Sequence, residues 1–187
     1  MARYGILMFA VALVVGWLYA RRADSSDGVI VVIWSGAAAL LALGIGQIIG
    51  NGVDRARPYT AMPASHVLLA RSADFSFPSD HATAAGAVAV GLLFAGRRYG
   101  SSMLGLVTCC VAVLLAVSRV YVGVHYPGDV IAGLGLGAAV AAAGMPVALW
   151  LLRPAVRWLD HTPARVLVGG TRPLSPASED TGRVSAE

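Results

Sequence analysis

Long blocks of apolar residues place the strongest constraint on what this chain can fold into. Five of them cover residues 4–20, 29–49, 82–96, 103–118 and 130–152. A helix crosses the hydrocarbon core of a bilayer with about 20 mostly apolar residues, and flanking residues bring the shorter blocks close to that length. Only 13% of the residues are charged, against roughly a quarter in soluble domains. The sequence therefore predicts an all-α fold, a polytopic transmembrane helix bundle with about five spans.

The first block begins close to the start of the chain, after Arg3, as the apolar core of a secretory signal peptide does. It lacks a convincing small-residue cleavage site. Its end carries aromatic and basic residues that are typical of a span reaching the membrane surface: Trp17, Tyr19, Arg21 and Arg22. We therefore count this block as a span and expect one bundle over residues 1–152. Residues 153–187 are expected to form a cytoplasmic tail that is disordered after about residue 170, where Pro, Ser, Thr and charged residues are frequent.

With five spans, residues 21–28, residues 97–102 and the tail lie on one side of the membrane. The loops 51–77 and 119–129 lie on the other side. The first side carries arginines close to the ends of the spans, namely Arg21, Arg22, Arg97, Arg98, Arg153 and Arg157. Because cytoplasmic loops of membrane proteins are rich in basic residues, we expect this side to be cytoplasmic.

The predicted outer side also carries arginines, which the charge rule does not explain: Arg55, Arg57, Arg71 and Arg119. We therefore expect some of them to bind a ligand. The net charge of +4 is not interpreted as a nucleic-acid site, because the arginines lie between the apolar blocks, where membrane topology accounts for them.

Three polar clusters fall at the outer ends of the predicted spans. They are Asp54-Arg55-Ala56-Arg57-Pro58, then Phe77-Pro78-Ser79-Asp80-His81, then Ser118-Arg119 with His125-Tyr126-Pro127-Gly128-Asp129. Each residue alone has an ordinary explanation, such as a surface histidine, a topology arginine or a helix N-cap. Two histidines, two arginines, a serine and an aspartate on one face, against the charge rule, favour a phosphate site.

The clusters contain the donors that a phosphate group needs. Arg57 and Arg119 can each donate two hydrogen bonds to phosphate oxygens. Ser79 adds a hydroxyl, and the first amides of the helix after it point at an anion-binding position.

The same clusters contain candidates for catalysis. His125 can act as a nucleophile, and Asp129, four residues later, can hold its imidazole in one tautomer. Pro127 and Gly128 suit the turn that returns Asp129 to His125. His81 is a second imidazole that can protonate a departing oxygen.

At these residues the chain resembles the membrane-bound type-2 phosphatidic acid phosphatases, which are relatives of the vanadium haloperoxidases. The signature of that family has three parts: Lys-x6-Arg-Pro, Pro-Ser-Gly-His and Ser-Arg-x5-His-x3-Asp. The third part is complete here as Ser118, Arg119, His125 and Asp129. The resemblance covers roughly residues 29–152 and implies an acid phosphatase/vanadium haloperoxidase-like core. That core has six helices in the family, against five predicted spans.

Two positions depart from the signature. Asp80 stands where the second part has Gly, and Gly50 stands where the first part has Lys, with Arg55 as the nearest cation to compensate. The string from Ser76 to Thr83 is similar to the undecaprenyl-pyrophosphate phosphatase branch, the bacitracin-resistance type, in which Asp at this position is characteristic.

The resemblance implies a phosphatase on the outer face of a bacterial plasma membrane that works without metal or cofactor. It would hydrolyse undecaprenyl pyrophosphate through a phosphohistidine and so recycle the lipid carrier of cell-wall synthesis. The residues carried over are catalytic His125, His81 and Asp129. The phosphate-binding residues carried over are Arg57, Ser79, Asp80, Arg119, Ser118 and Arg55.

Two alternatives stay open at this point. The substrate could be phosphatidate or phosphatidylglycerophosphate, because the signature specifies the reaction more closely than the lipid. The chain could also be a lipid-binding or transport protein without catalysis. That alternative does not explain why His81, His125 and Asp129 are present. In each case the partners are a lipid and the bilayer, and no feature of the sequence indicates an oligomeric state.

Overall fold

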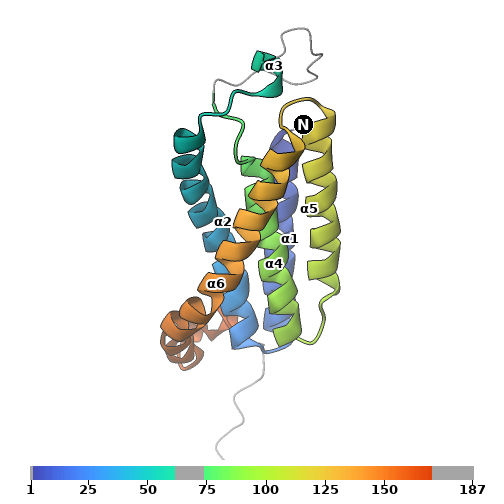
Figure 1. Ribbon diagram of the computed structural model, residues 1–187. Helices are drawn as coiled ribbons and strands as arrows, with labels where there is room; N and C mark the ends of the chain where they lie inside the picture. Colours follow the sequence, from blue (N-terminus) through green and yellow to red (C-terminus); the bar gives the residue numbers. More distant parts are fainter. Residues whose placement is uncertain (1, 62–73, 170–187) are drawn as a thin grey trace, which may run out of the picture.

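The computed structural model describes residues 2–61 and 74–169, and these form a bundle of helices (Figure 1). The five long helices are α1 (Ala2–Arg22), α2 (Ser26–Val53), α4 (Asp80–Arg98), α5 (Met103–Tyr121) and α6 (Pro127–Asp160). Two short elements complete the described part, α3 (Pro58–Ala61) and the 3₁₀ helix η1 (Pro163–Leu167). The predicted all-α bundle with five long helices is confirmed.

Within the described residues, three helical stretches are long and apolar enough to cross a membrane: Ser26–Ala61, Met103–Tyr121 and Pro127–Asp160. Helix α4 is less apolar and lies inside the bundle, where it packs against α1, α2, α5 and α6. Its buried residues are mostly Ala and Gly, with Leu92 fully buried at the centre. A helix that is surrounded by other helices contacts protein rather than lipid, so it does not need the hydropathy of a lipid-facing span.

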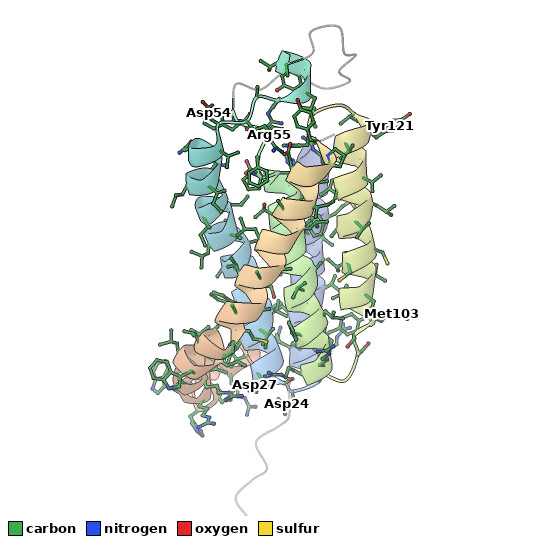
Figure 2. The ribbon with its side chains drawn as sticks, viewed as in Figure 1. Asp24, Asp27, Asp54, Arg55, Met103 and Tyr121 are labelled. Carbon is green, nitrogen blue, oxygen red and sulfur yellow. The ribbon has the colours of Figure 1, made fainter. Side chains whose placement is uncertain are left out.

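The three polar clusters lie at one end of the bundle, which we call the site end. Asp54, Arg55 and Tyr121 mark this end in Figure 2, whereas Asp24, Asp27 and Met103 mark the opposite end. The up-and-down order of the helices therefore matches the predicted division of the loops. Arg71 and the tail residues 170–187 lie outside the described residues.

Helices α4 and α6 approach so closely that their backbones are in contact. A Cβ atom added at Gly86 would meet the backbone of Leu134, and one added at Gly137 would meet the carbonyl oxygen of Thr83. Small residues allow this kind of packing between membrane helices, where van der Waals contact takes the place of the hydrophobic effect. The contact fixes the first turn of α4 beside α6, and both helices begin at the site end.

The opposite end is held by ion pairs. Asp27 of α2 binds Arg98 of α4 at 3.1 Å and Arg153 of α6 at 2.7 Å, so two of the predicted cytoplasmic arginines connect helices. Helix α6 runs past residue 152, where the sequence predicts the end of the bundle, and Trp17 Nε1 donates to the Leu167 carbonyl at 3.0 Å. Part of the predicted tail is thus packed against α1.

Replacing Gly137 by Ala should destabilise the bundle, because the new methyl group has no room against α4. We expect the free energy of unfolding in detergent to fall by about 1–3 kcal/mol, the usual cost of overpacking. Gly135→Ala is the matched control, since nothing lies within 4 Å of an added Cβ there. Thermal unfolding of both variants is the measurement. An equal effect at the two positions would contradict the close α4–α6 contact.

Candidate active site

His125 lies in the loop between α5 and α6, and its side chain is almost fully buried. Its Nδ1 atom is 2.8 Å from the Ser76 carbonyl oxygen, and its Nε2 atom is 3.3 Å from Arg57 Nη1. A carbonyl oxygen only accepts hydrogen bonds, so Nδ1 must carry the proton and donate it. In the neutral imidazole, Nε2 then keeps its lone pair and accepts from Arg57. His125 therefore presents Nε2 as the potential nucleophile.

The predicted contact between Asp129 and the His125 ring is replaced by an indirect one. The distance from Asp129 Oδ2 to His125 Nδ1 is 3.9 Å, too long for a hydrogen bond. Asp129 Oδ2 instead accepts from the Ser76 hydroxyl and from the Tyr126 amide. Because Ser76 supplies the carbonyl that holds the ring, Asp129 positions His125 through Ser76.

Asp129 is fully buried, and Arg55 is its counterion. Arg55 Nη1 donates to Asp129 Oδ1 at 2.8 Å, and the guanidinium group lies over the rings of Phe77 and Tyr126. A buried carboxylate needs such a partner, since desolvation of an unpaired charge is costly. Arg55, predicted to bind phosphate, therefore holds Asp129 in the described structure, with 44% of its side chain still exposed.

Arg57 is buried beside His125 and is fixed on both sides. Its Nη1 donates to the Val124 carbonyl at 3.1 Å, and its Nη2 pairs with the Asp74 carboxylate at 3.0 Å. Asp74 is half-exposed, so a ligand anion could compete for the same guanidinium group.

Two further predicted donors are buried and unpaired among residues 2–61 and 74–169. They are Ser79 Oγ and Arg119 Nε. Ser79 stands directly before α4, and its amide donates to the Asp129 carbonyl at 3.1 Å, which ties it to the start of α6. Buried donors without a partner cost free energy, which a hydrogen bond to a bound anion would offset.

Three other predicted residues take different places. Ser118 is exposed, and its hydroxyl donates to the Leu115 carbonyl of its own helix, so the complete motif does not bring this hydroxyl into the cluster. Both carboxylate oxygens of Asp80 accept from Gln47 Nε2, at 3.0 and 3.2 Å. His81 is half-buried in the first turn of α4 and lines a cavity together with Asp80.

Sequence reasoning missed the roles of Ser76 and Gln47. Ser76 stands in the Ser-Phe-Pro-Ser string before α4, but its main contact with His125 uses a backbone carbonyl, which every residue has. Gln47 lies inside an apolar block, and the presence of a polar side chain in that block is the only feature of the sequence that indicates a role for it.

Burial and the neighbouring Arg57 lower the pKa of His125 from 6.5 to about 4. The Ser76 carbonyl and Asp129 act in the opposite direction, and burial outweighs them. His125 is therefore neutral at pH 7, which is the form in which Nε2 carries no proton. Among the described residues, His, Cys, Asp and Glu side chains form no group of three or more that could hold a metal ion.

The fold and the site define a helical membrane protein with a buried histidine beside Arg57 at one end of the bundle. The model of the PAP2 superfamily matches residues 31–153, which is more than half of the chain, so the chain belongs to this superfamily. The match contains every residue carried over in the sequence analysis.

Relatives and a solved structure agree with this assignment. The chain is 33% identical to undecaprenyl-diphosphatase BcrC of Bacillus subtilis over 70% of its own length and 63% of the relative. It is 42% identical to decaprenylphosphoryl-5-phosphoribose phosphatase of Mycobacterium tuberculosis over 58% of its length and 56% of the relative. The chain thus spans less than two thirds of these relatives. A PAP2-type phosphatidylglycerolphosphate phosphatase from Bacillus subtilis has the same fold, with a TM-score of 0.52, 23% identity, and 86% and 73% of the two chains covered.

The lowered pKa of His125 predicts how stability depends on pH. Between about pH 6.5 and 4 the unfolded chain binds a proton at this residue that the folded chain does not bind. The free energy of unfolding should therefore decrease as the pH falls through this range, by up to about 3 kcal/mol from this group. Thermal unfolding at several pH values should show a shallower dependence for His125→Gln. The exposed His161 provides the control substitution, and identical slopes for His125→Gln and the wild type would contradict the prediction.

Proposed function

We propose that this protein is a membrane lipid phosphatase that hydrolyses undecaprenyl pyrophosphate to undecaprenyl phosphate and inorganic phosphate through a phosphohistidine. The observation that carries the proposal is the neutral, buried His125, whose Nε2 lone pair lies beside Arg57. A histidine held in this way is prepared to form a bond to phosphorus, and cationic donors around it are prepared to take up the developing charge.

In the first step, Nε2 of His125 attacks the terminal phosphorus in line with the bridging oxygen. Arg57, Arg119, Ser79 and the first amides of α4 stabilise the charge on the equatorial oxygens. The bond between the terminal phosphorus and the bridging oxygen breaks, and its electron pair stays on the departing lipid phosphate. His81 donates its proton to that oxygen as it leaves and so becomes neutral, ready to accept a proton in the second step.

In the second step, a water molecule attacks the phosphohistidine. His81 accepts a proton from this water, the bond between phosphorus and Nε2 breaks, and inorganic phosphate leaves. His125 returns to its neutral form with the lone pair restored. The Ser76 carbonyl keeps the Nδ1 proton in place throughout, so the same nitrogen is available for each cycle.

Two observations support a polyprenyl substrate. The relatives compared above are named for undecaprenyl and decaprenyl compounds, which share a long isoprenoid chain. The Pro-Ser-Asp-His variant, with Asp80, resembles the undecaprenyl-pyrophosphate phosphatase branch. Phosphatidate and phosphatidylglycerophosphate are the alternative substrates.

We further propose that the site end faces outward and the opposite end faces the cytoplasm. The opposite end carries Arg21, Arg22, Arg97, Arg98, Arg153 and Arg157, as the positive-inside rule requires. At the site end, Arg55 and Arg57 are engaged in the site and do not act as topology signals.

Purified protein should release phosphate from undecaprenyl pyrophosphate in the presence of EDTA. His125→Ala should lower this rate by roughly 10³-fold or more, because the covalent intermediate can no longer form. His161→Ala, at an exposed position, is the matched histidine control. Acid-labile phosphate trapped on the wild type but not on His125→Ala would distinguish catalysis from lipid binding. A rate that requires added divalent metal would contradict the mechanism.

His81→Ala should affect phosphomonoester lipids more than pyrophosphate lipids. A general acid contributes roughly 10²–10⁴-fold when the leaving group is poor, and a phosphate leaves more easily than an alkoxide. We therefore expect a smaller loss with undecaprenyl pyrophosphate than with phosphatidate, measured side by side with phosphatidylglycerophosphate. Equal and mild losses for His81→Ala and His125→Ala on all lipids would contradict these roles.

A further inference from the structure

A cavity of about 600 Å³ lies between α1, α2, α4 and α5. Its wall is apolar except for three side chains, Gln47, Asp80 and His81. These three belong to the outer end of α2 and the first turn of α4, so the polar part of the wall lies at the site end. The rest of the cavity extends toward the middle of the bundle, as far as Gly36 on α2 and Val88 on α4.

The cavity and the phosphate site share one boundary. His81 lines the cavity, and Ser79, which is two residues earlier, stands in the phosphate site. In the proposed reaction His81 contacts the oxygen that joins the terminal phosphate to the rest of the lipid. Beyond that oxygen the substrate continues with its second phosphate and then with its prenyl chain, and the cavity offers an apolar wall to that chain.

The cavity is open on one side, so its volume measures how much of a lipid chain it can surround. A methylene group occupies about as much space as a water molecule in the liquid, roughly 30 Å³. The cavity therefore holds on the order of 20 carbon atoms, which is about four isoprene units. A single prenyl chain can place its first units there, whereas a diacyl lipid must leave one of its two chains outside.

We propose that this cavity binds the first four or so isoprene units of a single prenyl chain, with Gln47 and Asp80 at its mouth. The inference rests on the proposed function and adds a dependence on chain length. The cavity contacts only the part of the prenyl chain nearest the diphosphate, so isoprene units beyond the first four do not change kcat/KM. The hydrogen bonds from Gln47 to Asp80 connect α2 to α4 at the point where the chain enters.

Gly36 and Gly44 provide a matched pair of substitutions on α2. Gly36 lines the cavity, and an added Cβ there meets only Leu13 Cδ1, at 3.5 Å, an ordinary contact. Gly44, about two turns along the same helix, is exposed and has nothing within 4 Å. Leu at position 36 fills part of the cavity, and Leu at position 44 adds the same side chain outside it.

The experiment compares kcat/KM of Gly36→Leu with that of the wild type on dimethylallyl, geranylgeranyl and undecaprenyl diphosphate in detergent micelles. At each chain length, kcat/KM of the variant is divided by that of the wild type. This ratio cancels the differences among the substrates in how they partition between water and the micelles. We expect this ratio to fall about tenfold from the one-unit to the four-unit substrate, the equivalent of roughly two lost methylene contacts. It should then stay level up to the eleven-unit substrate. Gly44→Leu should give the same ratio for all three.

Several outcomes would overturn the inference. They are a ratio that does not change with chain length, a ratio that continues to fall up to undecaprenyl diphosphate, and the same profile for Gly44→Leu. Equal kcat/KM of the wild type on phosphatidate and geranylgeranyl diphosphate would assign the cavity to acyl chains instead.

Ala84→Leu, from the α4 wall of the cavity, decides the question if Gly36→Leu does not fold. A wild type that releases no phosphate from any diphosphate would refute the proposed function itself, which is a separate result.

Discussion

The buried carboxylate of Asp129 is the group on which the arrangement of the site depends. It has no exposure to solvent, and a charge in that position is stable only with several partners. Its partners are the Arg55 guanidinium group after α2, the Ser76 hydroxyl before α4 and the Tyr126 amide at the start of α6. One side chain thus connects the segments that carry the three polar clusters. The need to neutralise it determines where those segments lie.

This requirement explains why the catalytic candidates are held by backbone and not only by side chains. The Ser76 hydroxyl is fixed by Asp129, and the carbonyl of the same residue fixes the His125 ring. The Asp129 carbonyl accepts from the Ser79 amide and so sets the start of α4. Pre-organised groups of this kind do not have to reorganise during the reaction, which is the main source of electrostatic catalysis.

Much of the fold and of the site could be predicted from the sequence, because both depend on patterns that a sequence records. The apolar blocks indicated the five long helices. Because successive spans run in opposite directions, their order placed Arg57, Ser79 and His125 at the same end of the bundle. Helix α4 is the least apolar of the five long helices in the described residues; its neighbours are other helices, and its small residues reflect that packing.

Where the contacts in the structure differ from those expected, the differences have physical reasons as well. Arg55 carries the positive charge that a phosphate needs. A sequence does not reveal that this guanidinium group forms an ion pair with the buried carboxylate of Asp129. The Ser118 hydroxyl matches a motif and yet bonds to its own helix. The contact of His125 with Ser76 could not be predicted, because it uses a backbone carbonyl and every residue has one.

The low pKa of His125 bears on where such an enzyme can operate. A site that faces outward, as proposed, meets water whose acidity the cell does not buffer. An imidazole with its ordinary pKa would lose much of its reactive form in a mildly acidic medium, whereas His125 keeps its lone pair down to about pH 4. Burial thus keeps the proposed nucleophile unprotonated when the pH around the cell falls.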